Sequence, residues 1–433
     1  MSTLDQRLIA AVGEENVLKD PAKISSFFRQ PVEKTGLRAL LPEKVEEVQS
    51  IVKLAREERL PVFTTYDSFF RQEVSSHKAG LLIDFRRMNK IERMEPRGMV
   101  VHVQRGVTYE QLTEETKKNG IKLLPAAAAT SRSVVEQSVN RAVNLRAARF
   151  PDATVANMKV VLADGRIHLT GTHALSEEGA NVAHDGSADL SRWYVGADDM
   201  FGIVTRATIN VYPIWEERKV CFFGFEQLEG ACALIRDIPR HEWALENIAL
   251  NKKALARLAG INEKGLPPWV AVIGLEGKKK LVDYYEKQVY DLVGRKGASN
   301  LTSKLGESAA IIERPWYAID QPCLGFYTTF KRIGEFDEVI EASLKDAGSS
   351  LDDVSRKVIS VASGGAVWLG YDLPAEMCEK VGVRLVDRGA FFDRPTGKLS
   401  EAVYSKMDAF VRHVKRIKNM MDPGNLLNPG IPF

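Results

Sequence analysis

Short apolar runs alternate with amphipathic stretches along most of this chain, and this alternation constrains the fold more than any other feature of the sequence. Apolar residues recur at helical spacing between residues 45 and 55, whereas the runs 61–64, 80–85 and 100–103 have the length and composition of strands. Residues 109–119 again have the pattern of a helix, which Gly120 ends. The pattern predicts a mixed α+β unit at the start of the chain.

Two further segments extend this interpretation. Residues 155–162 and 167–169 flank a turn that contains Asp164-Gly165, which predicts a β-hairpin, and alternation over 202–213 predicts another strand. A second mixed unit starts near Glu217, where predicted strands and helices alternate as far as residue 293. Such alternation favours a sheet covered by helices on one face. Residues from about 375 onward are predicted to be mostly helical, with an apolar stripe between Val403 and Ile417.

Length and charge bound the class of protein. The chain has 433 residues, which is too long for one compact core and suggests about two or three domains. Its 60 basic residues nearly balance 57 acidic ones, so nothing in the charge predicts nucleic acid or an acidic membrane as a partner. The N-terminus lacks the pattern of a signal peptide, and no apolar run approaches the roughly 18 residues of a membrane helix. We expect a cytoplasmic protein without a membrane span.

Cysteine and histidine are scattered. The four cysteines form no CxxC pair, which favours free thiols and argues against a disulfide or an iron–sulfur cluster held by this chain. The seven histidines include no H-x-H or HxxxH pair, so no metal site is predicted. His102 and His168 fall on predicted strands, where we interpret them as structural groups.

Several stretches carry a resemblance to one family. They are residues 42–62, 82–91, 160–165 and 196–208, together with the C-terminal Met421-Asp422-Pro423-Gly424-Asn425-Leu426-Leu427-Asn428-Pro429-Gly430. These stretches resemble the FAD-linked oxidases and dehydrogenases, and the last one is similar to the glycolate oxidase and D-lactate dehydrogenase branch. The resemblance implies an α+β fold with a PCMH-type FAD-binding domain over 1–215 and an α/β cap over 216–375. A helical segment over 376–433 would return to the FAD-type domain.

The same resemblance implies candidate cofactor residues. Gly196, Gly202, Ile203 and Thr205 match the segment that lies beside the adenosine half of FAD in that family, and Asn428 matches the segment that approaches the flavin ring. Two further candidates, Ser68 and Ser133, stand in the two segments where the family places its diphosphate loops.

Both of these loop segments depart from the family pattern. A diphosphate is normally held by backbone N–H groups of glycine-rich chain, yet neither 65–74 nor 133–146 contains a glycine. Asp67 and Glu136 would place carboxylates near the phosphates, at a cost of roughly 4 kcal/mol for like charges 4 Å apart. Phe69 and Phe70 either fill the cofactor groove or are ordinary core and loop residues. Four arginines could instead hold phosphates or form a solvated basic face: Arg132, Arg141, Arg146 and Arg149.

Catalytic groups of the family are also missing. Members that oxidise 2-hydroxy acids have paired histidines and a later histidine-bearing loop, but residues 362–371 and 388–395 contain no histidine here. His413 is the one histidine after residue 330, and no catalytic residue is predicted. Four aromatic residues could line a cap pocket or belong to the core: Tyr317, Tyr327, Trp368 and Tyr371.

Three functions remain open from the sequence. The leading hypothesis is a subunit of a flavin-dependent oxidoreductase whose own FAD site is degenerate or altered, paired with a catalytic paralogue or an electron-transfer partner. The second is an active FAD-dependent enzyme that oxidises a small hydroxy acid or alcohol. The third is a protein that binds another anionic ligand in the vacated groove.

Overall fold

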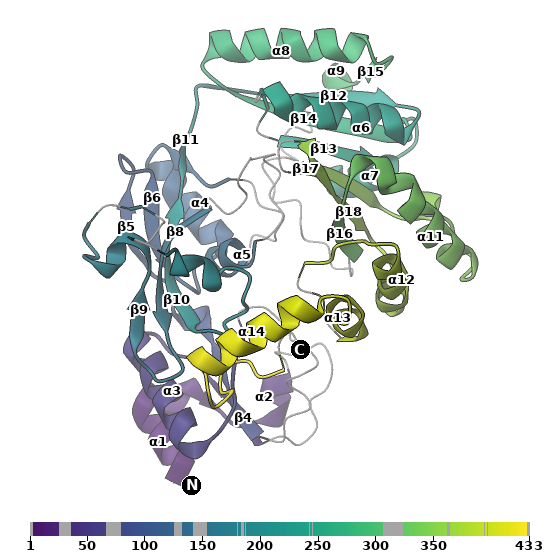
Figure 1. The fold of residues 1–433 in the computed structure, drawn as a ribbon. Helices are drawn as coiled ribbons and strands as arrows, with labels where there is room; N and C mark the ends of the chain where they lie inside the picture. The colour runs from purple at the N-terminus through teal and green to yellow at the C-terminus, as the bar shows by residue number, and fades with distance from the viewer. Residues whose placement is uncertain are drawn as a thin grey trace.

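The computed structural model describes residues 3–25, 36–65, 79–124, 132–141, 154–179, 181–182, 186, 188–241, 243–244, 246–305, 324–361, 364–393, 395 and 397–430. Three main sheets and a two-stranded ribbon organise this part of the chain (Figure 1). The mixture of helices and sheets is α+β, as the sequence predicts.

The first sheet is small and mostly parallel. Its strand order is β1-β2-β4-β3, in which β2, β4 and β3 run parallel and β1 pairs antiparallel with β2. Helix α3 packs against it because Val48, Ile51 and Val52 are fully buried on one helix face, as the apolar spacing predicts. The elements are α1 (Thr3–Val12), β1 (Val17–Leu18), α2 (Pro21–Ser25), β2 (Gly36–Leu40), α3 (Val45–Glu58), β3 (Val62–Thr65) and β4 (Ala79–Asp84).

The second sheet is antiparallel, with the order β5-β6-β10-β8-β9. The predicted hairpin is present as β8 and β9, and Gly165 takes the φ of +80° that its turn requires. The elements are β5 (Ile91–Glu95), β6 (Val100–Gln104), α4 (Tyr109–Lys118), β7 (Ile121–Lys122), α5 (Val134–Val139), β8 (Val155–Val161), β9 (Ile167–Leu169), β10 (Ile203–Asn210) and β11 (Tyr212–Pro213). Strands β7 and β11 form the ribbon.

The third sheet, called the cap sheet below, has seven antiparallel strands in the order β15-β12-β14-β13-β17-β18-β16. Its strands are β12 (Glu217–Phe225), β13 (Glu246–Asn251), β14 (Trp269–Gly277), β15 (Ser299–Asn300), β16 (Leu324–Thr328), β17 (Arg356–Val361) and β18 (Ala366–Tyr371). Its helices are α6 (Leu228–Asp237), α7 (Lys252–Ala259), α8 (Lys279–Gly294), α9 (Thr302–Leu305), α11 (Ile333–Lys345), α12 (Ala375–Asp387) and α13 (Gly397–Tyr404).

The two faces of the cap sheet differ. Helices α6, α8, α11, α12 and α13 contribute to the core on one face, which agrees with the predicted helical layer. The shorter α7 and α9 pack on part of the opposite face. The sequence pattern did not indicate that these two helices lie on a different face of the sheet from the others. Figure 1 shows α8 on the side of the sheet away from the first two sheets.

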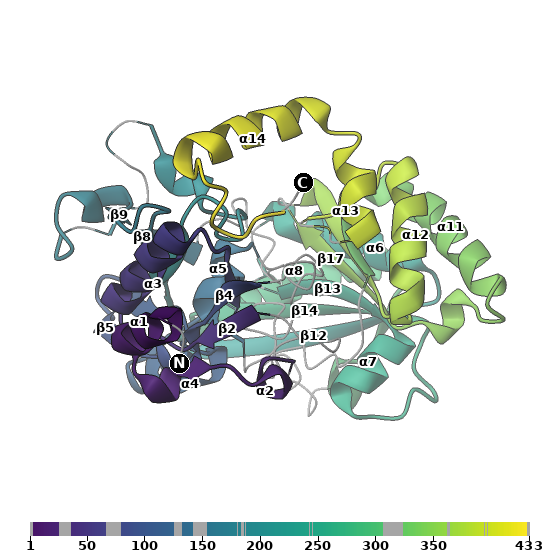
Figure 2. The same cartoon turned by 90° about the horizontal axis from the view of Figure 1, so that it is seen from below.

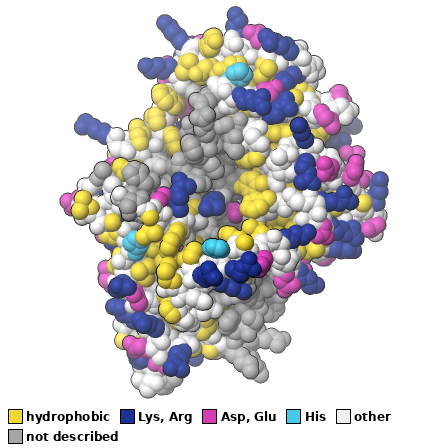
Figure 3. Space-filling model, in the orientation of Figure 1, with side chains coloured by type: hydrophobic (Ala, Val, Ile, Leu, Met, Phe, Trp, Pro, Cys, Tyr) yellow, Lys and Arg dark blue, Asp and Glu magenta, His cyan; other side chains and the backbone are white. Residues whose placement is uncertain are grey.

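The C-terminal segment returns to the first half of the chain through α14 (Asp408–Met421), which Figure 2 shows crossing the molecule from the α12–α13 side. Val414, Ile417 and Met421 pack on the core of the second sheet. Basic and hydrophobic side chains lie side by side over the surface around α14 (Figure 3). Among the described residues, no helix is long and apolar enough to span a membrane.

Candidate functional site

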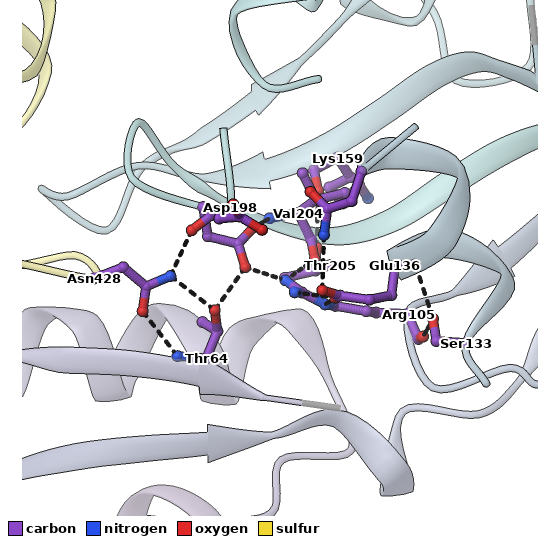
Figure 4. A network of polar contacts seen from close by, with 11 residues as sticks. Thr64, Arg105, Ser133, Glu136, Lys159, Asp198, Val204, Thr205 and Asn428 are labelled. Atoms are coloured by element: carbon purple, nitrogen blue, oxygen red, sulfur yellow. Dashed lines mark hydrogen bonds and ion pairs between the residues drawn. The ribbon is translucent and has the colours of Figure 1, made fainter. Parts of the chain in front are cut away.

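Three distant segments meet where the first and second sheets approach each other (Figure 4). They are the end of β3, the turn that precedes β10, and the C-terminal segment after α14. Leu426 O accepts from Val62 N at 2.8 Å, and Val62 O accepts from Asn428 N at 2.7 Å, so the C-terminal segment adds to the edge of β3. Lys418 of α14 holds the same segment by donating to Leu427 O, and it also donates to Met200 O. This meeting point of the end of β3, the turn before β10 and the C-terminal segment is called the junction below. It is built from both ends of the chain.

Asn428 joins all three segments. Its Oδ1 accepts from Thr64 N at 3.1 Å, and its Nδ2 donates to Thr64 Oγ1 at 3.0 Å and to Asp198 O at 2.6 Å. Asn428, Asp198 and Asp199 have φ values of 41°, 45° and 60°, in the left-handed region that residues other than glycine rarely adopt. Because such backbone costs free energy, surrounding contacts must hold it in place, and the side chains of Asn428 and Asp199 supply hydrogen bonds there.

Asp199 supplies the acceptor at the centre of the junction. Its carboxylate is buried and accepts from Thr64 Oγ1 at 2.7 Å, from Val204 N at 3.0 Å and from Arg105 Nη1. Thr64 belongs to the first sheet and Val204 to the second, so this one side chain bonds both sheets directly.

Arg105 is the cation of the junction. It follows β6, is 4% exposed, and lies between the carboxylates of Asp199 and Glu136. Burial by itself would lower the pKa of the guanidinium, but the two carboxylates raise that pKa above its usual value, so the side chain stays charged. Its Nη1 also donates to Val204 O at 3.1 Å, and the guanidinium lies 4.4 Å from the centre of the Phe85 ring.

The sequence predicts the Glu136 carboxylate near the cofactor phosphates, and in the structure this carboxylate pairs with Arg105. Its carboxylate accepts from Arg105 Nε at 3.1 Å and from Asn140 Nδ2 at 2.8 Å, so an internal cation balances its charge. Ser133 caps α5 by accepting from Glu136 N at 2.9 Å, and its hydroxyl donates to Arg105 O. The side chain of Ser133, one of the predicted cofactor residues, thus serves helix capping. Asn140 Oδ1 is buried and has no hydrogen-bond partner in the part of the chain that the structure describes.

The other predicted cofactor residues lie close to the junction. Gly196 has a φ of 76°, and a Cβ there would lie 3.4 Å from the guanidinium carbon of Arg141, which covers this position. At Gly202 a Cβ would lie 2.6 Å from Val160 Cγ1, so glycine is needed for close packing. Ile203 is fully buried, and Thr205 Oγ1 donates to Lys159 O at 3.0 Å.

Several sequence candidates lie outside the described residues, namely Ser68, Asp67, Phe69, Phe70, Arg146, Arg149 and Tyr317. Of the proposed arginine set, Arg141 is exposed and donates to Val195 O at 3.3 Å. Arg132 O accepts from Tyr109 N at 3.0 Å.

The aromatic and histidine candidates separate into different places. Tyr371 is 1% exposed in the core beneath the helices of the cap sheet, where its hydroxyl donates to Asp337 at 2.7 Å. Trp368 lies on the opposite face, against the core that α7 and α9 cover in part. His102 bonds Thr208 and His168 bonds Tyr194, which confirms their structural interpretation.

The residues that sequence reasoning missed are Thr64, Arg105 and Asp199. An arginine after an apolar strand gives no sign that it will be buried, since burial requires carboxylates that come from elsewhere in the chain. The doublet Asp198-Asp199 is the signal that could have pointed to the junction, because acidic residues between two apolar segments need a partner.

The side-chain donors of the described junction residues already have partners within the protein. A diphosphate requires donors, yet the side-chain donors of Thr64, Arg105, Ser133 and Asn428 are engaged within the junction. Among the described residues, Asn140 Oδ1 is a buried acceptor without a hydrogen-bond partner, and an acceptor repels a phosphate oxygen.

Comparisons with known proteins agree on the family. Residues 37–171 match the family described as an FAD binding domain. The chain is 24% identical over 217 residues to the D-lactate dehydrogenase of Archaeoglobus fulgidus, covering 49% of this chain and 47% of that one. It is also 24% identical over 241 residues to the glycolate oxidase subunit GlcD of Bacillus subtilis, covering 54% of this chain and 50% of the relative. The matches thus span about half the length of these curated relatives.

A solved structure matches over nearly the whole chain. It is p-cresol methylhydroxylase with substrate bound, which has a TM-score of 0.85 and 18% identity and covers 99% of this chain and 96% of that one. At this identity the likeness establishes the PCMH-type fold.

Proposed function

Because the chain belongs to the FAD-linked oxidase and dehydrogenase family, we propose that it is a subunit of a flavin-dependent oxidoreductase whose own dinucleotide site is altered. In this role it supports a catalytic paralogue or an electron-transfer partner rather than oxidising a substrate with its own FAD. The observation that carries the proposal is the Asp199 carboxylate, which bonds both sheets at the junction.

Side-chain contacts hold the first and second sheets together. Asp199 and Asn428 bond Thr64 of the first sheet directly, and Arg105 holds the Asp199 carboxylate by an ion pair on the side of the second sheet. Such contacts make the arrangement stable without a ligand between the sheets. The fold is therefore retained when dinucleotide binding is not.

Charge supports the same conclusion. Two carboxylates, Asp199 and Glu136, surround the single guanidinium of Arg105, so this buried group has a net charge of about −1. A diphosphate brought against it would meet like charge in a poorly screened environment. The absence of glycine in 65–74 and 133–146 removes the close backbone approach that could offset this repulsion.

The subunit role has support from one relative. The Bacillus subtilis relative is named as a subunit of glycolate oxidase. The described part of this chain holds no group of three or more His, Cys, Asp and Glu side chains suited to a metal ion. His413 is exposed on α14, and its ring bonds Ala409 O of the same helix.

The test is to purify the chain from its natural host with its neighbours intact and to identify what accompanies it. The proposal predicts copurification with a second oxidoreductase subunit that carries the flavin, while this chain, once separated, has no visible flavin absorbance. A yellow, isolated chain with one FAD per molecule would refute it. An isolated chain without flavin and without any copurifying oxidoreductase would refute the subunit role.

A second function has a specific observation in its favour. Arg105 neutralises part of the charge of Glu136, which removes one electrostatic objection to FAD, and residues 37–171 match an FAD binding domain. An active FAD-dependent enzyme for a small hydroxy acid or alcohol is therefore the alternative. Stoichiometric flavin that a substrate bleaches under anaerobic conditions would establish it. A tightly retained anion in a colourless chain would instead favour the binding protein.

A further inference from the structure

A row of polar side chains is buried on one face of the second sheet. Asn157, Thr208 and His102 are paired across β8, β10 and β6, and they are 1%, 1% and 4% exposed. Their neighbours Val103 and Met158 point to the other face, which carries the apolar core. Buried polar groups need hydrogen-bond partners, so this row requires a cover that supplies them.

The cover is the segment that follows β9, residues 170–179 and 181–182, called the clasp below. Thr170 and Val182 stand near its two ends, and the same side chain of the polar row bonds both. The amide nitrogen of Asn157, in the orientation that suits its neighbours, donates to Thr170 O at 3.0 Å and to Val182 O at 3.1 Å. The clasp is therefore a loop whose two ends are held on the polar row.

Two stacked imidazoles connect the clasp to the sheet. His173 of the 3-10 helix η5 (Gly171–Ala174) is 2% exposed, and its ring lies on that of His102, with centroids 5.5 Å apart and an angle of 15° between the planes. His173 Nε2 bonds Asn181 Oδ1 of the clasp at 3.1 Å. His102 Nδ1 bonds Thr208 Oγ1 at 3.0 Å. Neutral rings attract each other in this arrangement, whereas two imidazolium ions repel each other.

Charged groups surround the two rings. The groups are Glu92, Arg93 and Glu95 of β5, Lys159 of β8, Arg206 of β10 and Glu177 of the clasp. The three carboxylates balance the three cations, so a proton added to either imidazole leaves a net positive charge. Protonation has a second cost at His102. Arg93 lies 3.1 Å from His102 Nε2 and can donate to it only while this nitrogen keeps its lone pair.

The pKa values indicate in which direction pH acts. Burial lowers the pKa of His102 and of His173 below the usual 6.5, although bonds to Glu95 and Asn181 oppose this lowering. Once the clasp leaves the sheet, both rings regain the pKa of an exposed histidine. Attachment of the clasp is therefore strongest above pH 6.5 and weakens as the pH falls below 6.5. Glu177 stays ionised in this range, because its pKa is about 2.

We propose that the stacked pair His102 and His173 is a pH-sensitive latch, which holds the clasp on the second sheet at neutral pH and releases it in mildly acidic solution. Release separates two imidazolium rings, uncovers the polar row and takes Glu177 away from Arg206. This inference goes beyond the subunit role and does not depend on whether the chain binds a flavin.

Hydrogen–deuterium exchange of the full chain at pH 7.5 and pH 5.5, read by mass spectrometry, tests the proposal. Exchange times are corrected for the intrinsic effect of pH, and the hydrogen-bonded amides of Thr172 and Leu175 report on the clasp. One pH unit below 6.5, each histidine favours opening by up to about tenfold, so protection of the clasp should fall by up to about a hundredfold. Strand β12 is the internal control and should keep its protection. Equal protection of the clasp at the two pH values, or an equal loss in β12, would overturn the proposal.

Two variants assign the effect to the latch. His102→Gln and His173→Gln should each reduce the ratio of clasp protection between the two pH values by up to about tenfold, because each removes one titrating ring. A merely structural loss would lower protection equally at both pH values and leave this ratio unchanged. His168→Gln is the matched control, since His168 is a half-buried histidine of β9 that bonds Tyr194 on the apolar face.

Circular dichroism checks that each variant folds, and if one variant unfolds, the other decides. The control variant should keep the ratio of the unmodified chain. An unchanged ratio in a folded variant of His102 or His173 would refute the latch.

Discussion

Replacing Asp199 by Asn tests whether side chains alone hold the first two sheets together. The Asp199 carboxylate is 6% exposed and receives bonds from Thr64, Arg105 and Val204. Asparagine keeps the size of the side chain but removes the charge that Arg105 faces. Removing one partner of a buried ion pair costs about 3–5 kcal/mol, and we expect the lower end because Glu136 still pairs with Arg105.

Urea unfolding followed by circular dichroism gives the free energy of unfolding, with the transition of the first half of the chain analysed separately if the two halves unfold in steps. The matched control is Asp408→Asn, since Asp408 pairs with Arg412 at the exposed surface of α14. That variant should lose less than about 1 kcal/mol. The double variant with Arg105→Met should cost less than the sum of the two single variants by about 0.5–3 kcal/mol. A loss for Asp199→Asn as small as the control would refute the reasoning.

Three further predictions concern packing and pH. Gly202→Ala should destabilise the chain by about 1–3 kcal/mol in thermal unfolding, because the new Cβ would lie 2.6 Å from Val160 Cγ1, and a loss below about 0.5 kcal/mol would contradict this. Burial by itself would raise the pKa of Glu177, but hydrogen bonds from a lysine and an arginine lower this pKa to about 2. The stability that the ionised Glu177 provides above pH 4.5 should therefore be lost as the pH falls toward 2. Glu177→Gln should make the free energy of unfolding less dependent on pH in this range, and an unchanged pH profile would contradict the prediction. Burial lowers the pKa of His102 and His173 below 6.5, so stability should fall as pH drops below 6.5, and NMR titration should give both imidazoles pKa values under 6.5.

Local periodicity predicts much of the fold. The helix α3, the strands β3, β4 and β6 and the hairpin β8–β9 follow from apolar spacing and from one turn glycine, because each of these signals lies within a few neighbouring residues. The two faces of the cap sheet could not be told apart, since its strands are buried on both sides and their apolar runs carry no alternation.

The candidate site was less accessible to sequence reasoning. The positions of Gly202 and Asn428 were found through family resemblance, but the partners that define their roles come from other segments. Arg105 and Asp199 are separated by 94 positions in the chain, and only the fold reveals that they form an ion pair. Glu136 illustrates the same limit, because its carboxylate accepts from Arg105, a partner that local sequence does not indicate.

The central claim is that this chain keeps the fold of an FAD-linked oxidoreductase and has lost the dinucleotide site. Titration of FAD into the purified, flavin-free chain, followed by flavin fluorescence and calorimetry, tests it most directly. We predict no saturable binding up to about millimolar FAD, a concentration that corresponds to roughly 4 kcal/mol of affinity. Stoichiometric binding with micromolar or tighter affinity would contradict the account.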